Sequence, residues 1–278
     1  MRICPQNFFD EATISASPSP PSGMPASNLQ TTRRDEVCRS PSLTDFVISG
    51  SWDGDARTVD FWGIWPGALA GCKVRVELFS DATLSTRVYD SGTLDVVTVS
   101  APAWGAFTWG AVPWAIDETD RTFRQAPAVR FLSSAVVAGS FRITISNSFT
   151  DFPYFEARRI WLAHSITAPF NAQFGLAPVV RDASEQVRTI GAALDVLDVD
   201  TYRAAQFDTV FETEADRAIW SDVLAYCGKT REVVVSLWPG EGSRRERDTT
   251  WCGYLEAINP VVFANANFHT LQLSLVES

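Results

Sequence analysis

The sequence predicts a mainly β protein, with an N-terminal jelly-roll-type β-sandwich followed by a second β-barrel-like domain that carries one helix. Two observations lead to this prediction. Short segments of alternating apolar and polar residues, separated by Gly, Asp and Ser clusters, recur along the chain, which is typical of antiparallel strands. Only one segment has a clear helical period. The chain has 278 residues, enough for two ordinary domains, and 46% of them are hydrophobic.

Residues 1–25 are expected to form an extended arm. The stretch from Ser15 to Gly23, SASPSPPSG, is rich in Pro and Ser, and proline disfavours both helices and interior strands. Such an arm would cross the surface of its own or of a neighbouring subunit. A simple ordered loop is the alternative.

Residues 26–150 are expected to form the β-sandwich. In its last predicted strand Phe141, Ile143 and Ile145 share one face and polar residues the other, because side chains alternate along a strand. A run of such strands without a convincing helix fits a jelly-roll-type sandwich. The predicted strands cover residues 46–48, 59–62, 74–78, 93–99, 128–132 and 141–146.

Residues 151–278 are expected to form the split-barrel-like second domain. Its helix is predicted over residues 213–227, with Thr213 as the N-cap and Gly228 just after the end. A single helix in an otherwise all-β domain would cover the open side of a barrel. The predicted strands cover residues 156–163, 186–190, 192–197, 202–209, 233–237, 251–258 and 269–277.

The net charge of −10 argues against a nucleic-acid partner and against an anionic membrane surface, because both need clustered Lys and Arg. The basic run from Arg244 to Arg247 is interrupted by a Glu and is expected to be a solvated hairpin tip. No stretch reaches the roughly 18 apolar residues of a membrane-spanning helix, and no signal-peptide pattern is present. We therefore expect no membrane insertion.

Cysteine usage predicts reduced, mostly buried thiols in a chain made in a cytoplasm. The five cysteines have unrelated spacings without a CxxC motif, and only His164 and His269 could complete a metal site. No metal or cofactor is predicted. Asp53-Gly54-Asp55 resembles the start of a calcium loop, but the remaining ligands are missing, so a polar turn is preferred. Asp81 and Asp90, which flank a predicted strand, stay as candidate calcium ligands.

Catalysis is not supported by the sequence. It contains no GxSxG, HExxH, Walker or GxGxxG pattern. Glycoside hydrolysis needs two carboxylates that face each other, and nothing pairs any two of the candidates. His164 and His269 have no nucleophile motif nearby, so hydrogen-bonded structural histidines are favoured. The chain is expected not to be an enzyme. The candidate carboxylates are Glu77, Asp90, Glu156 and Asp208.

A Trp-rich loop is the best candidate for a ligand or interface site. It spans residues 101–116 and contains Trp104, Trp109 and Trp114. Tryptophans in an all-β domain most often pack in the core. The alternative is a groove or an interface, where Trp is enriched, and aromatic faces also stack on sugars.

Three short motifs resemble a pattern of tail proteins from long-tailed bacteriophages. In that family, such motifs belong to an N-terminal sandwich related to galactose-binding-like domains. The second half, which includes Trp251 to Glu256, is similar to the same group, and more loosely to the split barrel of distal tail proteins, which form rings that join the tail tube to the tip. The motifs are Pro25-Ala26-Ser27-Asn28-Leu29, Val37-Cys38-Arg39-Ser40 and Val88-Tyr89-Asp90-Ser91-Gly92.

The resemblance implies an oligomeric structural component of a phage tail tip or baseplate. Its partners would be further copies of itself, as a ring or another symmetric assembly, and the tube and hub proteins of the tail. It would be made in the host cytoplasm and reside in the virion. In distal tail proteins the ring-forming barrel precedes the galactose-binding-like domain, and here the reverse order is expected. The alternative function is carbohydrate binding, as host-surface adhesion through the Trp-rich loop. A hydrolase of cell-wall or capsule polymer is the third hypothesis.

Overall fold

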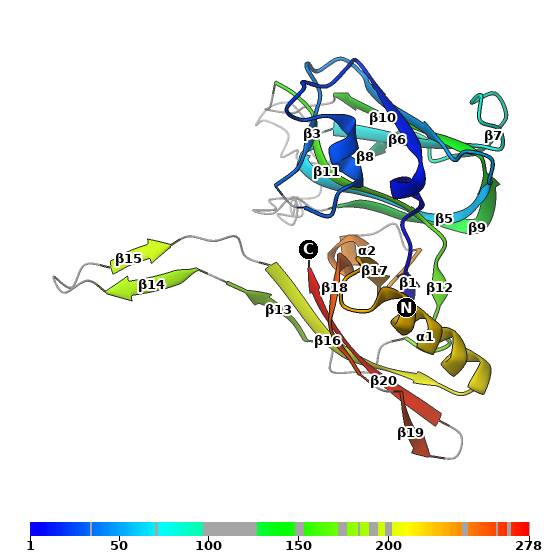
Figure 1. Ribbon diagram of the computed structural model, residues 1–278, viewed down its shortest axis with the longest axis vertical. Helices are drawn as coiled ribbons and strands as arrows, with labels where there is room; N and C mark the ends of the chain where they lie inside the picture. The colour runs from blue at the N-terminus through cyan, green and yellow to red at the C-terminus, as the bar shows by residue number, and fades with distance from the viewer. Residues whose placement is uncertain are drawn as a thin grey trace, which may run out of the picture. The chain divides into compact units, whose positions relative to one another are not determined.

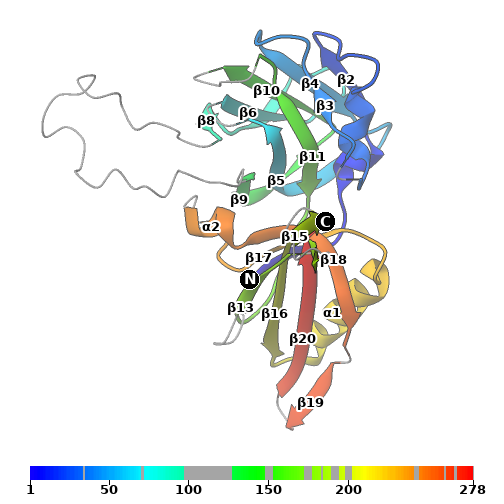
Figure 2. The same ribbon diagram turned by 90° about the vertical axis from the view of Figure 1, so that its left-hand side faces the viewer.

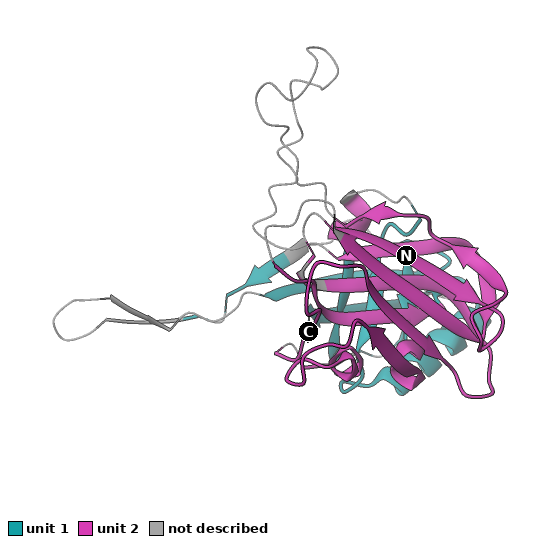
Figure 3. Cartoon of the chain, turned by 90° about the horizontal axis from the view of Figure 1, so that it is seen from above, with its two compact units in different colours: residues 1–6, 165–241, 249–278 teal, residues 7–164, 242–248 magenta. Residues whose placement is uncertain are grey.

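In a computed structural model the chain forms two compact units (Figure 1, Figure 3). Unit 1 comprises Met1–Gln6, Ser165–Glu241 and Thr249–Ser278, and unit 2 comprises Asn7–His164 and Gly242–Asp248. The predicted mainly β class is confirmed, because both units are built on β-sheets and the described residues hold two α-helices. The structure describes residues 1–33, 35–69, 72–96, 127–147, 153–171, 177–182, 184–188, 194–197, 202–240, 244–259, 261–265 and 268–277.

The larger sheet of unit 2 has β10 (Ser140–Asn147) at its centre, between β4 and β6. Phe141, Ile143 and Ile145 are at most 1% exposed and lie in the core, as the alternation predicts, whereas Arg142 faces outward. The strand order is β2-β4-β10-β6-β7, with β8 also paired to β6. The other strands are β2 (Thr13–Ser17), β4 (Phe46–Ser51), β6 (Cys72–Phe79), β7 (Arg87–Asp90) and β8 (Leu94–Asp95).

The smaller sheet closes the sandwich in the order β3-β11-β5-β9. Trp62 and Ile64 of β5 and Ile160 and Leu162 of β11 join the inward residues of β10 in one core. Burying each such side chain stabilises the fold by about 1.5–3 kcal/mol. Because β11 belongs to this core, the sandwich extends past residue 150, the predicted domain boundary. The strands are β3 (Cys38–Arg39), β11 (Glu156–Ala163), β5 (Arg57–Ala68) and β9 (Ala128–Ala138).

The first 25 residues, expected to form an extended arm, are largely built into the two units. β1 (Arg2–Cys4) is an interior strand of the unit 1 sheet, between β12 and β17, and Ile3 is fully buried. The short 3-10 helix η1 (Phe8–Glu11) buries Phe9, and β2 pairs with β4 in unit 2. The proline-rich signal therefore describes only the loop around residues 18–22. The apolar residues before that loop, Ile3 and Phe9 among them, place the chain in both cores.

Unit 1 is built on an antiparallel sheet with the order β12-β1-β17-β18-β20-β16-β13 (Figure 2). Among the described strands this path is open, with β12 and β13 at its ends, so the predicted barrel is not closed. Leu271, Leu273 and Leu275 of β20 face the core, as their alternation predicts. The strands are β12 (Ile166–Thr167), β17 (Val233–Ser236), β18 (Thr250–Ile258), β20 (Phe268–Glu277), β16 (Tyr202–Phe211), β13 (Ala177–Arg181) and β19 (Val262–Asn265), which pairs with β20.

Unit 2 is inserted in the sequence of unit 1. The unit 1 sheet starts with β1 at the beginning of the chain and resumes with β12, directly after the sandwich. The expected order, with a complete sandwich before a complete second domain, therefore differs from what the structure shows. No sequence pattern indicates this insertion, because a three-residue strand such as β1 is too short to display a period.

Helix α1 (Glu214–Cys227) matches the predicted helix at both ends. The Thr213 hydroxyl accepts a hydrogen bond from the Asp216 backbone N–H at 3.1 Å, and Gly228 at φ +54 follows the last turn. Trp220, one of its core residues, contacts the ring of Phe211 at a centroid distance of 5.4 Å. Among the described helices, none is long and apolar enough to cross a membrane.

The basic run at Arg244 forms a short helix rather than a solvated hairpin tip. Helix α2 (Arg244–Asp248) lies between β17 and β18 in sequence but groups with unit 2. Arg247 Nη1 donates to the Val96 carbonyl at 3.3 Å, and Glu246 is only 1% exposed. The run therefore packs against the sandwich, which its charges alone did not predict.

A two-stranded ribbon continues the β13–β16 pair beyond the unit 1 sheet (Figure 1). β14 (Glu185–Arg188) and β15 (Leu194–Leu197) pair with each other, and among the described strands with nothing else. The root of the ribbon is the pair Arg181 and Tyr202, the last one between β13 and β16. We call β14 and β15 together the ribbon.

Candidate functional site

The Trp-rich loop lies outside the described residues. Trp104, Trp109 and Trp114 were the only predicted ligand or interface residues, and their role stays a prediction. Several other tryptophans pack in the cores, which is the common role of this residue in all-β domains. These buried tryptophans are Trp52, Trp62, Trp161, Trp220 and Trp251, each at most 3% exposed.

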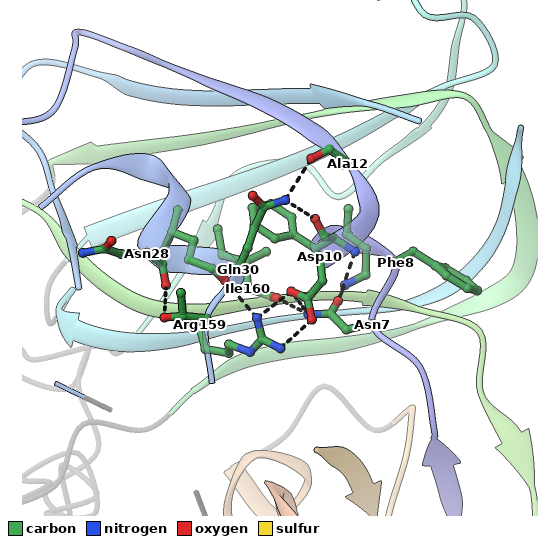
Figure 4. Close-up of polar contacts among 12 residues, drawn as sticks. Asn7, Phe8, Asp10, Ala12, Asn28, Gln30, Arg159 and Ile160 are labelled. Carbon is green, nitrogen blue, oxygen red and sulfur yellow. Dashed lines mark hydrogen bonds and ion pairs between the residues drawn. The ribbon is translucent and has the colours of Figure 1, made fainter. Parts of the chain in front are cut away.

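A polar cluster of unit 2 joins the start of the sandwich to β11 (Figure 4). Arg159 of β11 donates twice to the Asp10 carboxylate, at 2.6 and 2.7 Å, and once to the Leu29 carbonyl, at 3.1 Å. Asn7 donates to Asp10 and to the Ile160 carbonyl. We call this cluster the strap.

The strap is a structural feature of the chain rather than a ligand site. The Arg159 side chain is 8% exposed, and its hydrogen bonds to Asp10 and to the Leu29 carbonyl lie within unit 2. The Asn7 amide oxygen also accepts from the backbone N–H groups of Phe9 and Leu162. A buried network satisfied in this way fixes one arrangement of its strands. No local sequence pattern predicts the strap, because its members are about 150 positions apart.

The motifs behind the phage-tail resemblance also have structural roles. Asn28 of the first motif donates to the Val37 carbonyl at 2.9 Å. Arg39 of the second forms a double hydrogen bond with the Glu156 carboxylate, at 2.6 and 2.9 Å, and its guanidinium lies 3.9 Å from the centroid of the Tyr154 ring. These contacts hold β3 against β11.

The Tyr89-Asp90-Ser91-Gly92 turn clamps β7 to β6. Asp90 accepts two hydrogen bonds from Arg75, at 2.6 and 2.9 Å, and one from the Gly92 backbone N–H. The Arg75 hydrogen bond, followed by the Gly92 N–H, lowers the pKa of Asp90 to about 2. The Ser91 hydroxyl accepts from the Val76 N–H, and Gly92 takes φ +65, a left-handed conformation that suits glycine.

The outer face of β6, β7, β8 and β10 gathers charged side chains, and we call it the arginine face. Arg87 lies 2.8 Å from both Glu77 and Asp90, and Arg75 lies 3.3 Å from Glu77. The Glu77 side chain is 9% exposed and is surrounded by arginines, so two of the four candidate catalytic carboxylates are held in ion pairs here. The charged residues of the arginine face are Lys73, Arg75, Glu77, Arg87, Asp90, Asp95 and Arg142.

The remaining candidate carboxylates are also accounted for. Glu156 pairs with Arg39, and Asp208 is exposed on β16. His164 Nδ1 lies 3.4 Å from the Asp60 carboxylate at the end of β11. His269 Nε2 lies 3.8 Å from Glu214, the first residue of α1.

The candidate calcium ligands have other partners. The Asp81 carboxylate accepts hydrogen bonds from the side chains and backbone N–H groups of Thr83 and Ser85, and from the Thr86 N–H. These bonds, with the Thr83 hydroxyl first, hold its pKa well below the usual range. Asp53-Gly54-Asp55 is an exposed turn, as expected. Among the described residues no three His, Cys, Asp or Glu side chains group as a metal site would require.

No protein-family profile and no curated protein sequence matches the chain. Solved structures that are similar include chitosan-binding module 1 of a chitosanase/glucanase from Paenibacillus sp. IK-5 (16% identity, 57% of this chain and 99% of that chain, TM-score 0.39). A family 32 carbohydrate-binding module of C. perfringens NanJ, in complex with galactose, has 15% identity over 59% of this chain and 100% of its own, with a TM-score of 0.40. The lectin domain of lectinolysin, complexed with Lewis B antigen, has 13% identity over 58% and 97%, with a TM-score of 0.40.

These neighbours are carbohydrate-binding, galactose-binding-like β-sandwich modules, and none of those named is a phage tail protein.

Proposed function

We propose that the chain is a non-catalytic structural protein that works by binding other protein chains, as a component of the tail tip or baseplate of a long-tailed phage. The observation that carries this proposal is the ribbon, whose two strands pair only with each other among the described strands. An isolated two-stranded hairpin is marginally stable in water and needs a further strand or a packing surface.

The root of the ribbon supports the same proposal. Val179 and Val180 are consecutive residues of β13, so they point to opposite faces, and they are 50% and 63% exposed. β13 also ends the strand path of its sheet. Natural proteins usually cover or blunt such edges, and an uncovered apolar edge favours contact with another chain.

The phage-tail part of the proposal rests on the three motifs in unit 2. The cysteines fit synthesis in a reducing host cytoplasm, since all five are buried thiols. Burial raises the pKa of Cys38 to about 12 and that of Cys227 to about 11, so neither forms a reactive thiolate near neutral pH. In this proposal the partners are further copies of the chain and the tube and hub proteins, and the location is the virion tail.

The test is removal of the ribbon alone. Arg181 and Tyr202 are directly opposite each other, so residues 182–201 can be replaced by Asn-Gly, which closes a two-residue hairpin turn. In a phage whose own copy of the gene is disrupted, the full chain is expected in purified particles and the ribbon-free chain is not. A thermal unfolding curve that matches the parent would show that unit 1 is intact. Equal incorporation of the two chains would contradict the proposal.

Carbohydrate binding is the second candidate, and the Trp-rich loop favours it. Three tryptophans within residues 104–114 supply the flat aromatic faces on which sugars stack. The expected result on a glycan array is binding by the full chain that is lost in W104A/W109A and kept in F170A. Phe170 is a suitable control because it is an exposed aromatic residue of unit 1. Binding that survives the double substitution, or the lack of any bound sugar, would contradict this candidate.

A further inference from the structure

The arginine face carries one positive charge that its own carboxylates do not balance. Its charged side chains sum to +1, in a chain whose net charge is −10. The positive members are Lys73, Arg75, Arg87 and Arg142, and the negative members are Glu77, Asp90 and Asp95.

Arg142 differs from Arg75 and Arg87 of this face, which both donate hydrogen bonds to its carboxylates, and its guanidinium lies 5.3 Å from the centroid of the Phe79 ring. Its nearest carboxylate oxygen, on Glu77, is 3.9 Å away, beyond hydrogen-bond distance, and its side chain is 37% exposed. Among the described residues its guanidinium has no hydrogen-bond partner. It lies on the central strand of the sheet, between Ser49 of β4 and Glu77 of β6. An exposed guanidinium with free donors is suited to bind a carboxylate through two parallel hydrogen bonds.

The ribbon has the opposite charge. Its two strands contain Glu185, Asp195 and Arg188, a sum of −1, and the sequence from residue 182 to residue 200 contains five carboxylates and one arginine, a sum of −4. The register of β14 and β15 places positions 185, 187, 195 and 197 on one face of the ribbon, because paired residues share a face and alternate residues repeat it. Glu185 and Asp195 are therefore on the same face, and Arg188 is at a position of the other face.

We propose that the acidic face of the ribbon of one copy docks on the arginine face of a second copy of this chain. This inference rests on the proposed function, and it names the partner of the ribbon. Glu185 and Asp195 supply carboxylates to the face around Arg142, and the sandwich sheet supplies the packing layer that a two-stranded hairpin lacks.

A second copy fits the charges better than an unrelated partner. Identical chains of net charge −10 repel each other unless opposite local charges meet. The ribbon and the arginine face are two different surfaces of the same chain and have opposite signs, so every copy offers both. Contact between two different surfaces is heterologous, and its repetition closes into a ring where the rotation allows.

The experiment is sedimentation velocity of the full chain and its variants at about 0.1 M and about 1 M salt, where the Debye lengths are about 10 and 3 Å. The wild type is expected to associate at low salt and to dissociate at high salt. R142Q and E185Q/D195N are each expected to weaken association about tenfold or more. The matched controls are R188Q, on the other ribbon face, and R33Q, an exposed arginine elsewhere in unit 2. Both controls are expected to associate like the wild type.

Charge reversal separates contact between copies from every other explanation. E185K/D195K and R142E are each expected to stay monomeric alone and to form a mixed complex when combined, because only then do opposite charges meet. For each variant, a thermal unfolding curve that matches that of the wild type excludes misfolding as the cause of a loss of association. A wild type that is monomeric at both salt concentrations, association that ignores these substitutions, or a mixture that stays monomeric would overturn the inference. The inference would also be overturned if the control variants R188Q and R33Q lost association as strongly as R142Q and E185Q/D195N.

The two proposals can fail separately. A chain present in virions whose self-association does not depend on Arg142 or Glu185 contradicts only the docking between copies. A chain that associates through these residues but is absent from virions contradicts only the tail function.

Discussion

Replacing Arg159 with alanine removes the centre of the strap, and we expect a large loss of stability in unit 2. The substitution deletes two hydrogen bonds to Asp10 and one to the Leu29 carbonyl. Removing one partner of a buried ion pair costs about 3–5 kcal/mol, and an unsatisfied buried carbonyl costs about 1–3 kcal/mol. The Asp10 side chain is 33% exposed, so water replaces part of the lost interaction. The expected decrease in the free energy of unfolding is about 2–4 kcal/mol.

Urea unfolding followed by tryptophan fluorescence measures this loss, with an expected midpoint shift of about 1 M or more. Arg33→Ala is the matched control, since its side chain is 67% exposed and its pairs with Asp35 and Glu36 lie at the surface. That control should change stability by less than about 0.5 kcal/mol. Asp10→Asn and the double variant complete a cycle that isolates the coupling energy. If Arg159→Ala loses no more than the control, the strap does not hold the sandwich together.

Three further predictions follow from individual contacts. The pKa of Asp90 is lowered to about 2, chiefly by Arg75, so its stabilising contribution is full above about pH 4 and is lost as the pH falls through about 2. Asp90→Asn should reduce the pH dependence of the urea unfolding midpoint over that pH range. A pH dependence equal to that of the wild type would contradict this. Because burial raises the pKa of Cys38 to about 12, a thiol reagent at neutral pH should label the cysteines only in denaturant, and rapid labelling of the native chain would be the opposite result. Gly253→Ala would push a Cβ into the backbone of Val276, so thermal denaturation should show a clear loss, and an unchanged melting temperature would disprove the clash.

The elements predicted best are those with a regular apolar pattern over many residues and a single buried face. β10 and α1 match their predicted ranges closely, because Phe141, Ile143 and Ile145 repeat every second residue and because Thr213 and Gly228 mark the helix ends. In both cases the local pattern and the tertiary packing require the same conformation, which is where sequence reasoning works best.

The elements predicted worst depend on partners far along the chain. β1 is three residues long and is buried only because β12 and β17 lie on its two sides. β11 was assigned to the second domain, since nothing in its own sequence shows that Ile160 completes the core of the sandwich. The ribbon was predicted as two strands, but its lack of further pairing appears only in the sheet topology. Non-local pairing leaves little trace in a short window of sequence.

The candidate site was the least predictable part. In the motifs that resemble phage tail proteins, Arg39 and Asp90 hold strands together, and Asn28 joins a short 3-10 helix to the Val37 carbonyl. The strap around Arg159 and the arginine face around Arg142 had no signal in the sequence, because each forms only when separate strands meet. Composition showed the net charge of the chain but not its separation into an acidic ribbon and an arginine face.

Quantitative mass spectrometry of purified phage particles tests the central claim most directly. A structural component that binds other tail proteins is expected at a fixed number of copies per particle, in constant ratio to the tail-tube protein and resistant to a high-salt wash. A chain that is absent from purified infectious particles, or whose amount varies from one preparation to the next and falls with washing, would contradict the claim that it is a structural part of the tail.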